Sequence, residues 1–243
     1  MKFFICSDIH GNERALDAVL DLYRKESPCT FLFLGDCVGY GPHPDACLEK
    51  ILDIPQSHLV MGNHEWALLD RSERIHLNPL AAKVLNWSED LLQGRYDEVI
   101  RNRFQIEVDT DSFLGVHGSP VNPEEWPYLF SYIDADEAFS RKDFRLCFVG
   151  HTHIPVMFTF KEGNKIMEGD VTFRLDPGDR YIINPGSVGQ PRDLDFRAAC
   201  CIFDSDEGTI TLHRCEYDVE AEVQDFEKAG LPTFLGERLL YGM

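Results

Sequence analysis

The first sixty residues alternate between short apolar runs and segments with helical spacing of apolar side chains. The apolar runs cover residues 2–7, 31–35 and 58–62. Residues 12–26 repeat apolar side chains at helical spacing before a Ser27-Pro28 stop, and a second helix is expected near 44–52 after a turn rich in Gly and Pro. This alternation of strands and helices predicts parallel βαβ units.

The pattern changes in the second quarter of the chain. Residues 66–100 lack a strand signal and repeat apolar side chains at helical periods, so we expect a helical excursion there. After it, short β-type runs are separated by Gly, Asn or Asp, and only 134–142 and 217–229 have helical spacing. We therefore expect two packed sheets with helices outside, a layered α/β arrangement. Since no repeat or flexible linker interrupts the chain, one domain is expected over residues 1–243.

Composition adds an argument about charge. Lys and Arg number 23 and Asp and Glu 42, a formal net charge of −19, and 44% of the 243 residues are hydrophobic. This apolar content excludes a disordered chain, and the acidic surface disfavours a nucleic-acid polymer or an anionic membrane as partner. No stretch approaches the ~20 apolar residues of a membrane span, so we expect a cytoplasmic protein with reduced, partly buried cysteines. A substrate that carries phosphate would need a local source of positive charge.

Five apolar runs end in small or polar residues and then present His or Asp at once. They lead into Asp8-Ile9-His10, Gly35-Asp36, Gly62-Asn63-His64-Glu65, His117-Gly118 and Gly150-His151-Thr152-His153. Ligands of such sheets bind beyond the carboxyl ends of the strands, so these polar tips should converge. Imidazole and carboxylate ligands without cysteine suit a pair of first-row divalent ions. Two such ions, bridged by one carboxylate, would clamp a phosphoryl group, activate water and supply the positive charge that the exterior lacks.

In this order, the five segments resemble the calcineurin-like metallophosphoesterase superfamily. The resemblance spans residues 2 to about 190. The motifs SDIHGN, VGYGP, MGNHE and NPGSVGQPR are similar to those of the bacterial and archaeal predicted phosphodiesterases of that group. It implies an α/β fold with four layers, an αββα sandwich of two mixed sheets flanked by helices. It also implies two divalent transition-metal ions as cofactors, with manganese expected and iron, zinc, nickel or cobalt as alternatives.

The resemblance also implies a role for each matching residue. One ion would be held by Asp8, His10 and His153, the other by Asn63, His117 and His151, and Asp36 would bridge the two. His64 would not be a ligand but would contact the phosphate, beside Asn63, and protonate the leaving group. An imidazole with a pKa near ~6.5 suits that task at neutral pH.

The segment around Asp36 departs from one branch of the family. Protein serine/threonine phosphatases read GDxVDRG, which places a second Asp against the catalytic His and an Arg on the phosphate. This chain reads GDCVGYG at residues 35–41. Both helper residues are absent, and this disfavours membership of that branch.

Two further residues are candidates for substrate contacts. Arg192 follows a strand and a Gly-rich turn, where it could contact phosphate or form a surface ion pair with Asp193 or Asp195. Asn12 could touch phosphate or cap the helix that follows it. The aromatic segment 120–132 could stack a leaving group or pack against the helical excursion.

These observations predict a metal-dependent phosphoester hydrolase that acts on a small phosphoester or nucleotide. We expect a phosphodiesterase or a phosphoanhydride hydrolase of dinucleoside polyphosphates, in which a metal-bridging hydroxide attacks phosphorus and His64 protonates the leaving group. One alternative is a metal-dependent protein phosphatase. The other is a protein-binding scaffold without catalytic activity, which the complete set of eight polar residues disfavours.

Overall fold

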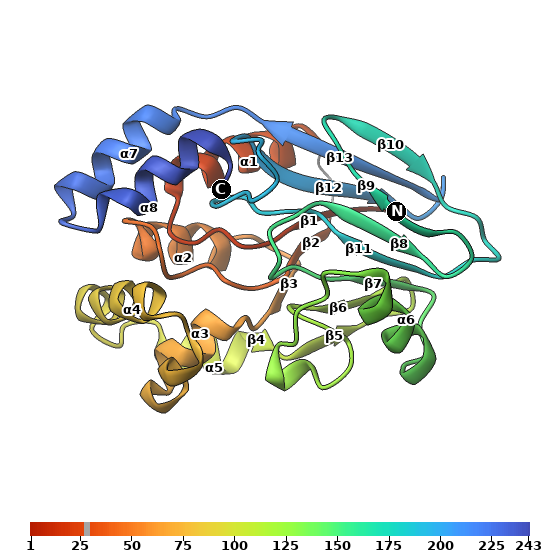
Figure 1. Cartoon of the computed structure of the whole chain (residues 1–243), viewed down its shortest axis with the longest axis horizontal. Coiled ribbons are helices and arrows are strands. Elements are labelled where there is room, and N and C mark those ends of the chain that lie inside the picture. The colour runs from red at the N-terminus through yellow and green to blue at the C-terminus, as the bar shows by residue number, and fades with distance from the viewer. Residues whose placement is uncertain (27–29) are drawn as a thin grey trace.

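Two mixed β-sheets lie face to face, and helices cover their outer sides (Figure 1). This computed structural model describes residues 1–26 and 30–243. The α-helices are α1 (Glu13–Glu26), α2 (Pro44–Leu52), α3 (Asn63–Leu69), α4 (Pro79–Leu92), α5 (Asp97–Arg103), α6 (Tyr132–Arg141), α7 (Val219–Lys228) and α8 (Thr233–Glu237). Short 3-10 helices are η1 (Arg71–His76), η2 (Pro123–Glu125) and η3 (Arg238–Tyr241).

The larger sheet has the order β10-β13-β12-β1-β2-β3-β4. Its strands are β1 (Lys2–Cys6), β2 (Thr30–Phe33), β3 (Ser57–Val60), β4 (Phe104–Gln105), β10 (Val171–Arg174), β12 (Ala198–Asp204) and β13 (Thr209–Cys215). Strands β1 to β4 are parallel, as the βαβ pattern predicts, whereas β12 pairs with β1 antiparallel and places Cys201 opposite Ile5. The first strand of the chain is therefore central in this sheet.

The second sheet has the order β5-β6-β7-β11-β8-β9. Its strands are β5 (Glu107–Asp109), β6 (Leu114–Val116), β7 (Leu146–Phe148), β8 (Val156–Thr159), β9 (Gly163–Ile166) and β11 (Tyr181–Asn184). Strands β6, β7 and β11 are parallel, and the remaining pairs are antiparallel. In both sheets, parallel strands thus end at one common edge.

Burial on both faces explains why the strands are uninterrupted apolar runs. Phe3 and Ile5 of β1 pack between the sheets with Phe148 of β7. Phe4 and Cys6 point to the opposite face and join the apolar cluster under α1 and α2. Side chains alternate along a strand, so only a continuous apolar sequence can fill both interfaces. Helix α6 covers the outer face of the second sheet in the same way.

The predicted layered α/β fold, with two mixed sheets and flanking helices, is confirmed. The prediction of only two helices in the second half is wrong, because α8 is also helical and its five residues are too few to show a period. Strand β10 lacks a clear β-type sequence signal, because its side chains are half-buried or exposed and partly polar. The helical excursion is longer than 66–100, since it begins with α3 and ends with α5. The predicted Ser27-Pro28 stop lies outside the described residues.

Two expectations from composition can be compared with the described part of the chain. Within residues 1–26 and 30–243, no helix combines the length and apolarity needed to cross a bilayer. The seven cysteines in these ranges are free thiols, and all but the half-buried Cys215 are buried.

Candidate metal centre and active site

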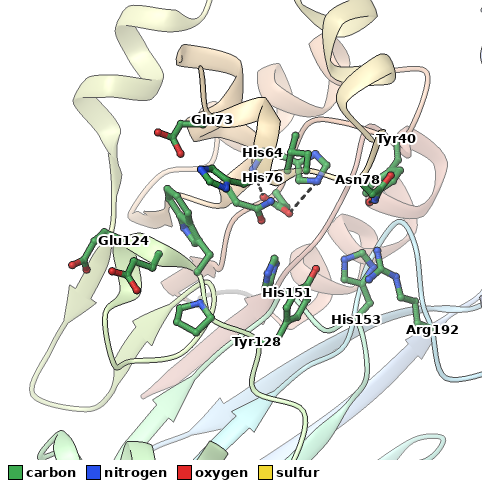
Figure 2. A pocket seen from close by; sticks show the side chains of 16 residues that line it. Tyr40, His64, Glu73, His76, Asn78, Glu124, Tyr128, His151, His153 and Arg192 are labelled. Carbon is green, nitrogen blue, oxygen red and sulfur yellow. Dashed lines mark hydrogen bonds and ion pairs between the residues drawn. The ribbon is translucent and has the colours of Figure 1, made fainter. Parts of the chain in front are cut away.

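A cavity of about 580 Å³ opens where the parallel strands of both sheets end (Figure 2). Its floor is formed by residues that follow these strands, namely Asp36, Asn63, His64, His151 and His153. One wall comes from residues 73–78, in η1 and the turn before α4, and another from residues 124–128. Both walls come from segments that connect the strands carrying the floor: residues 73–78 lie between α3 and α4, and residues 124–128 lie between β6 and α6.

Each predicted ligand lies directly after a strand, so the two sheets bring distant parts of the sequence together. Asp8 and His10 follow β1, Asp36 follows β2, Asn63 follows β3, His117 follows β6, and His151 and His153 follow β7. All are buried except Asn63, which is half-buried. The structure thus unites all seven predicted ligand positions at one edge of the sandwich.

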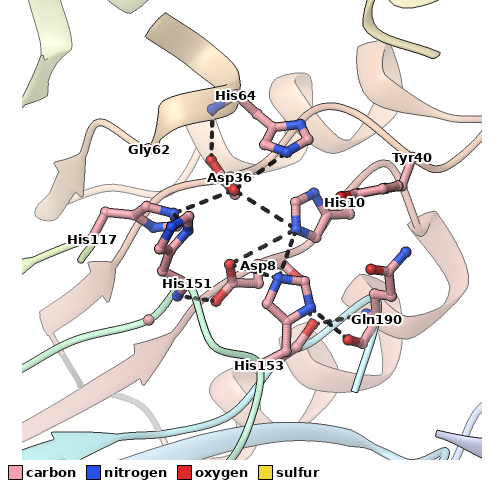
Figure 3. A network of polar contacts seen from close by, with 12 residues as sticks. Asp8, His10, Asp36, Tyr40, Gly62, His64, His117, His151, His153 and Gln190 are labelled. Atoms are coloured by element: carbon pink, nitrogen blue, oxygen red, sulfur yellow. Dashed lines mark hydrogen bonds and ion pairs between the residues drawn. The ribbon is translucent and has the colours of Figure 1, made fainter. Parts of the chain in front are cut away.

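Asp8, His10 and His153 form the first group of donor atoms (Figure 3). The Nε2 atoms of His10 and His153 are 3.1 Å apart, and Asp8 Oδ1 lies 3.3 Å from His153 Nε2. Asp8 Oδ1 is buried without a hydrogen-bond partner, while Oδ2 accepts from the His151 backbone N–H at 3.1 Å. A buried, unpaired carboxylate oxygen between two imidazoles is the arrangement expected of a metal ligand.

His117, His151, Asn63 and Asp36 form the second group. His117 Nε2 lies 3.1 Å from His151 Nδ1, 3.2 Å from Asn63 Oδ1 and 3.3 Å from Asp36 Oδ2. Asp36 Oδ2 also lies 3.8 Å from His10 Nε2 in the first group. The Asp36 carboxylate therefore stands between the two groups, as a bridging ligand must.

The protonation of the histidines tests whether these groups fit metal ions. Three ring Nδ1 atoms face backbone carbonyls: His10 faces Val38, His117 faces Leu34 and His153 faces Gln190, at 2.7–3.1 Å. Because a carbonyl only accepts, each Nδ1 carries hydrogen, and in the neutral ring Nε2 then presents a lone pair. The lone pairs of His10 and His153 then face each other at 3.1 Å, which is repulsive unless a cation lies between them.

The spacing of the donor atoms fits the same interpretation. Two ligand atoms that each lie about 2.1 Å from one ion are about 3.0–3.4 Å apart in octahedral or tetrahedral coordination. The distances of 3.1–3.3 Å from His153 to His10 and Asp8, and from His117 to His151, Asn63 and Asp36, fall in this range, while the 3.8 Å between Asp8 Oδ1 and His10 Nε2 is longer. Nitrogen and oxygen donors without sulfur suit first-row divalent ions. The residues present therefore fit the metal ions that the sequence predicts.

Charges within the site favour a cation in the same place. Burial alone would raise the pKa of Asp36, but the surrounding imidazoles outweigh burial and hold it well below its usual value. Burial lowers the pKa of His10 and of His151, and their imidazole neighbours add to the effect. For His117 burial is outweighed by Asp36, which raises its pKa to about 9. The ionised Asp36 and the neutral rings of His10 and His151 therefore offer lone pairs to a cation, which would replace the extra proton on His117.

The backbone at the ligands is unusual for residues that carry side chains. Asp8, His10, Asp36, His151 and His153 all have φ between 50° and 67°. This left-handed region costs a residue with a Cβ roughly 1–2 kcal/mol. The surrounding hydrogen bonds must hold these turns in place against this cost.

Glu65 is a buried residue to which the sequence analysis gave no role. Its carboxylate accepts backbone N–H groups of Asp36, Cys37, Val38 and Gly62 at 2.7–3.2 Å. These contacts hold the turn that carries Asp36. The signal was present, because Glu three residues after the Gly before a helix is the acidic half of a capping box.

Residues of the NPGSVGQPR segment hold the other ligand turns. Asn184 Nδ2 donates to the Gly150 carbonyl at 2.7 Å, beside His151. Ser187 Oγ donates to the Asp8 carbonyl at 2.7 Å and accepts from the Gln190 N–H. Asn184, at the end of β11, and Ser187, in the turn after it, therefore hold ligand turns of both sheets.

His64 lies above the metal groups without joining either as a predicted ligand. Its backbone N–H donates to Asp36 Oδ1 at 2.9 Å, and its Nε2 is 3.9 Å from Asp36 Oδ2. Its Nδ1 is buried without a hydrogen-bond partner, which agrees with the absence of the second Asp of the GDxVDRG pattern. Burial lowers its pKa, although Asp36 opposes this.

The structure separates the alternatives for Arg192 and Asn12. Arg192 lines the cavity and donates to Gln190 Oε1 at 2.9 Å, while its expected surface partners Asp193 and Asp195 pair with Arg214 and Arg197. Asn12 Oδ1 accepts from the Ala15 N–H at 3.0 Å, and its Nδ2 donates to Gly189 and Tyr217. Asn12 caps α1, and its amide has no position left for a phosphate.

The aromatic segment 120–132 contributes to packing and to the cavity. Trp126 packs against Trp66, with 6.0 Å between ring centroids, and its Nε1 donates to the Met61 carbonyl. Tyr128 stacks on the His151 ring at 3.9 Å and on Phe130 at 4.8 Å. The exposed His76 also lines the cavity.

Comparison with known proteins identifies relatives over the whole chain. Residues 1–208 match the profile of the calcineurin-like phosphoesterase superfamily domain. The crystal structure of a metallophosphoesterase from Sphaerobacter thermophilus has 36% sequence identity and a TM-score of 0.88, with 100% of both chains covered.

Two curated proteins extend the comparison. The uncharacterized protein MJ0912 of Methanocaldococcus jannaschii is 36% identical over 98% of this chain and 97% of its own length. Phosphodiesterase YfcE of Escherichia coli strain K12 is 24% identical over 79% of this chain and 82% of its own length.

Proposed function

This chain belongs to the calcineurin-like phosphoesterase superfamily and is a phosphoester hydrolase, and from that premise we propose that it hydrolyses small phosphodiesters at a centre of two divalent metal ions. The observation that carries the proposal is the pair of donor groups at the cavity floor, where ring nitrogens lie 3.1 Å apart in each group and those of His10 and His153 face each other with lone pairs. When bound, the two ions supply positive charge to the phosphoryl oxygens and make water acidic enough to act as a nucleophile.

The protein's own residues hold and orient the reacting groups. Asp8, His10 and His153 would hold one ion, Asn63, His117 and His151 the other, with Asp36 shared. Arg192 would contact the phosphoryl oxygens from the side of the cavity, because no carboxylate in the described structure engages it. His64 would donate its Nε2 proton to the leaving oxygen, since its Nδ1 faces protein on the other side.

Cavity shape and charge support a diester over the other substrate classes. A cavity of about 580 Å³ is the size that holds a small molecule, whereas a phosphorylated protein surface needs an open groove. Glu73, Glu124 and Glu125 also line it, and Figure 2 shows Glu73 and Glu124 on the side away from Arg192. A dinucleoside polyphosphate would bring several negative charges toward these carboxylates, whereas a diester brings one.

A substrate panel tests the proposal. Protein loaded with Mn²⁺ is assayed on an aryl monoester, an aryl diester, a dinucleoside tetraphosphate and a phosphopeptide. The aryl diester should have the highest kcat/KM. Preference for the phosphopeptide would instead favour a protein phosphatase, and no turnover by fully loaded protein would favour the scaffold without catalytic activity.

Two variants test the residue roles. His64→Ala should keep both ions and lose kcat most with leaving groups of high pKa, because these need protonation. An equal loss with every leaving group would refute the acid role. Arg192→Ala should raise KM for phosphate esters, and an unchanged KM would remove Arg192 from the binding site.

A further inference from the structure

Tyr40 is a buried aromatic residue that packs beside both a candidate metal ligand, His10, and the predicted proton donor, His64. It follows Gly39 in the turn after β2, with φ of 59°, and is only 6% exposed. Its ring centroid lies 4.8 Å from that of His10, edge to face, and 5.1 Å from that of His64. Figure 3 shows Tyr40 beside both rings. No role was given to Tyr40 by the sequence analysis.

The His64 imidazole needs something to fix its orientation. A catalytic histidine is usually oriented by a hydrogen bond at the ring nitrogen that does not react. Here Nδ1 is that nitrogen, and it is buried without a partner. The His64 ring is instead enclosed by Gly39, Tyr40 and His10. The ring centroids of His10 and His64 are 4.8 Å apart. Packing is therefore the constraint that the described structure provides.

Tyr40 is itself held at its far end. Asn78 Nδ2 donates to the Tyr40 hydroxyl at 2.9 Å. Asn78 Oδ1 accepts from the Ala81 N–H at 2.8 Å, so this residue also caps α4. The Tyr40 ring further joins an apolar cluster with Ala81 and Val84 of α4 and Leu235 of α8. Since both ends of the side chain are fixed, Tyr40 can act as a rigid support.

From these contacts we propose that Tyr40 is a positioning residue for His64. Its ring, anchored by Asn78, holds the imidazole with Nε2 directed at the metal centre. The inference rests on the proposed function, because it takes His64 as the group that protonates the leaving oxygen. Tyr40 acts through His64, so its loss should affect proton donation rather than metal binding.

The experiment measures how kcat depends on the leaving group. A series of aryl diesters with leaving-group pKa values from low to high is assayed with wild type, Tyr40→Leu, Tyr40→Phe and His64→Ala. Metal content and Tm are measured for each protein. A displacement of about 1 Å at a reacting group can cost about 100-fold in rate. We therefore expect Tyr40→Leu to lose about 100-fold in kcat with the poorest leaving group and less than about threefold with the best.

Tyr40→Phe keeps the ring but loses the anchor, so its loss should be smaller than that of Tyr40→Leu. Asn78→Asp removes the donor to Tyr40 and keeps an oxygen that can cap α4. It should steepen the leaving-group dependence in a folded protein even where Tyr40→Leu folds poorly. A matched control is Tyr181→Leu in β11 of the second sheet. Like Tyr40, Tyr181 is buried, with 5% of its surface exposed, and its hydroxyl accepts a hydrogen bond, from the Asp176 N–H at 2.8 Å. It should lower Tm without changing the dependence.

The outcomes distinguish the two proposals. A steeper dependence in His64→Ala but not in folded, metal-loaded Tyr40→Leu or Asn78→Asp would overturn the role of Tyr40 and leave the acid role of His64 intact. An unchanged dependence in His64→Ala would overturn the acid role and, with it, the inference about Tyr40. A steeper dependence in Tyr181→Leu would show that loss of stability alone produces the effect, and would also overturn the inference.

Discussion

Gly39→Ala should disable the proton donor while leaving the metal groups intact. Gly39 has φ of 84°, and a Cβ at this position would lie 2.1 Å from His64 Nδ1 and 2.8 Å from its Cε1. Nonbonded carbon and nitrogen atoms prefer about 3.5 Å, so the imidazole must retreat by roughly 1 Å or more. The Tyr40 and His10 rings restrict that movement, because their centroids are 5.1 and 4.8 Å from the His64 ring.

Two separate costs follow from this geometry. A left-handed backbone with a Cβ costs about 1–2 kcal/mol, which for a chain of this size corresponds to a fall in Tm of about 2–8 °C. The displaced imidazole should also lower kcat by about 100-fold for leaving groups of high pKa. Neither cost concerns the ligand atoms of the metal groups, so metal content should not change.

Gly208→Ala isolates the backbone cost. Gly208 has φ of 65°, and a Cβ there would meet nothing within 4 Å. Both variants should therefore lose similar stability, as measured by thermal unfolding, and only Gly39→Ala should lose kcat with poor leaving groups. If the two variants had the same kinetics, or if Gly39→Ala lost metal, the argued role of the His64 ring position would be refuted.

Three further changes have defined expectations. Asp36→Asn should weaken Mn²⁺ binding at both groups, as measured by equilibrium dialysis, because Asp36 Oδ2 lies 3.3 Å from His117 Nε2 and 3.8 Å from His10 Nε2. Weaker binding at one group alone would contradict a bridging role for Asp36. Glu65→Gln should destabilise the protein by about 3 kcal/mol in urea unfolding, since an NH₂ group cannot accept the backbone N–H groups of the Asp36 turn. Burial, and then Asp225, raises the pKa of Glu222 to about 8 from an ordinary 4.5, so the folded state binds this proton more tightly than the unfolded chain. The contribution of Glu222 protonation to the free energy of unfolding is complete below pH about 4.5 and is lost as the pH rises through about 8. The free energy of unfolding falls by at most about 5 kcal/mol over this range. Glu222→Gln should therefore be more stable than wild type at pH 9 but not at pH 5, and equal unfolding curves at pH 9 would refute this assignment.

The convergence of the candidate ligands could be predicted because it follows from a local pattern. An apolar run that ends in a small or polar residue and then His or Asp marks the end of a buried strand, and parallel strands end at one edge. Asp8, Asp36 and His117 meet for that reason, although they belong to different strands. No knowledge of loop conformation was needed for this step.

Other features of the site depend on tertiary contacts that no local pattern contains. The cavity walls come from residues 73–78 and 124–128, which are placed by packing such as that of Trp126 on Trp66. The left-handed backbone at Asp8 and His151 follows from hydrogen bonds between distant turns, including that from the His151 N–H to Asp8. Tyr40 gave no sequence signal because its partner Asn78 lies 38 residues away.

The central place of β1 in the larger sheet has a consequence for protein synthesis. Strand β1 carries the first ligand turn but lies between β2 and β12, and Ser187 donates to the Asp8 carbonyl. At ~5–20 residues per second, a ribosome needs roughly 10–40 s to proceed from Asp8 to the end of β12. During that interval β1 lacks its neighbour β12, so we expect the candidate metal groups to form only late in the synthesis of the chain.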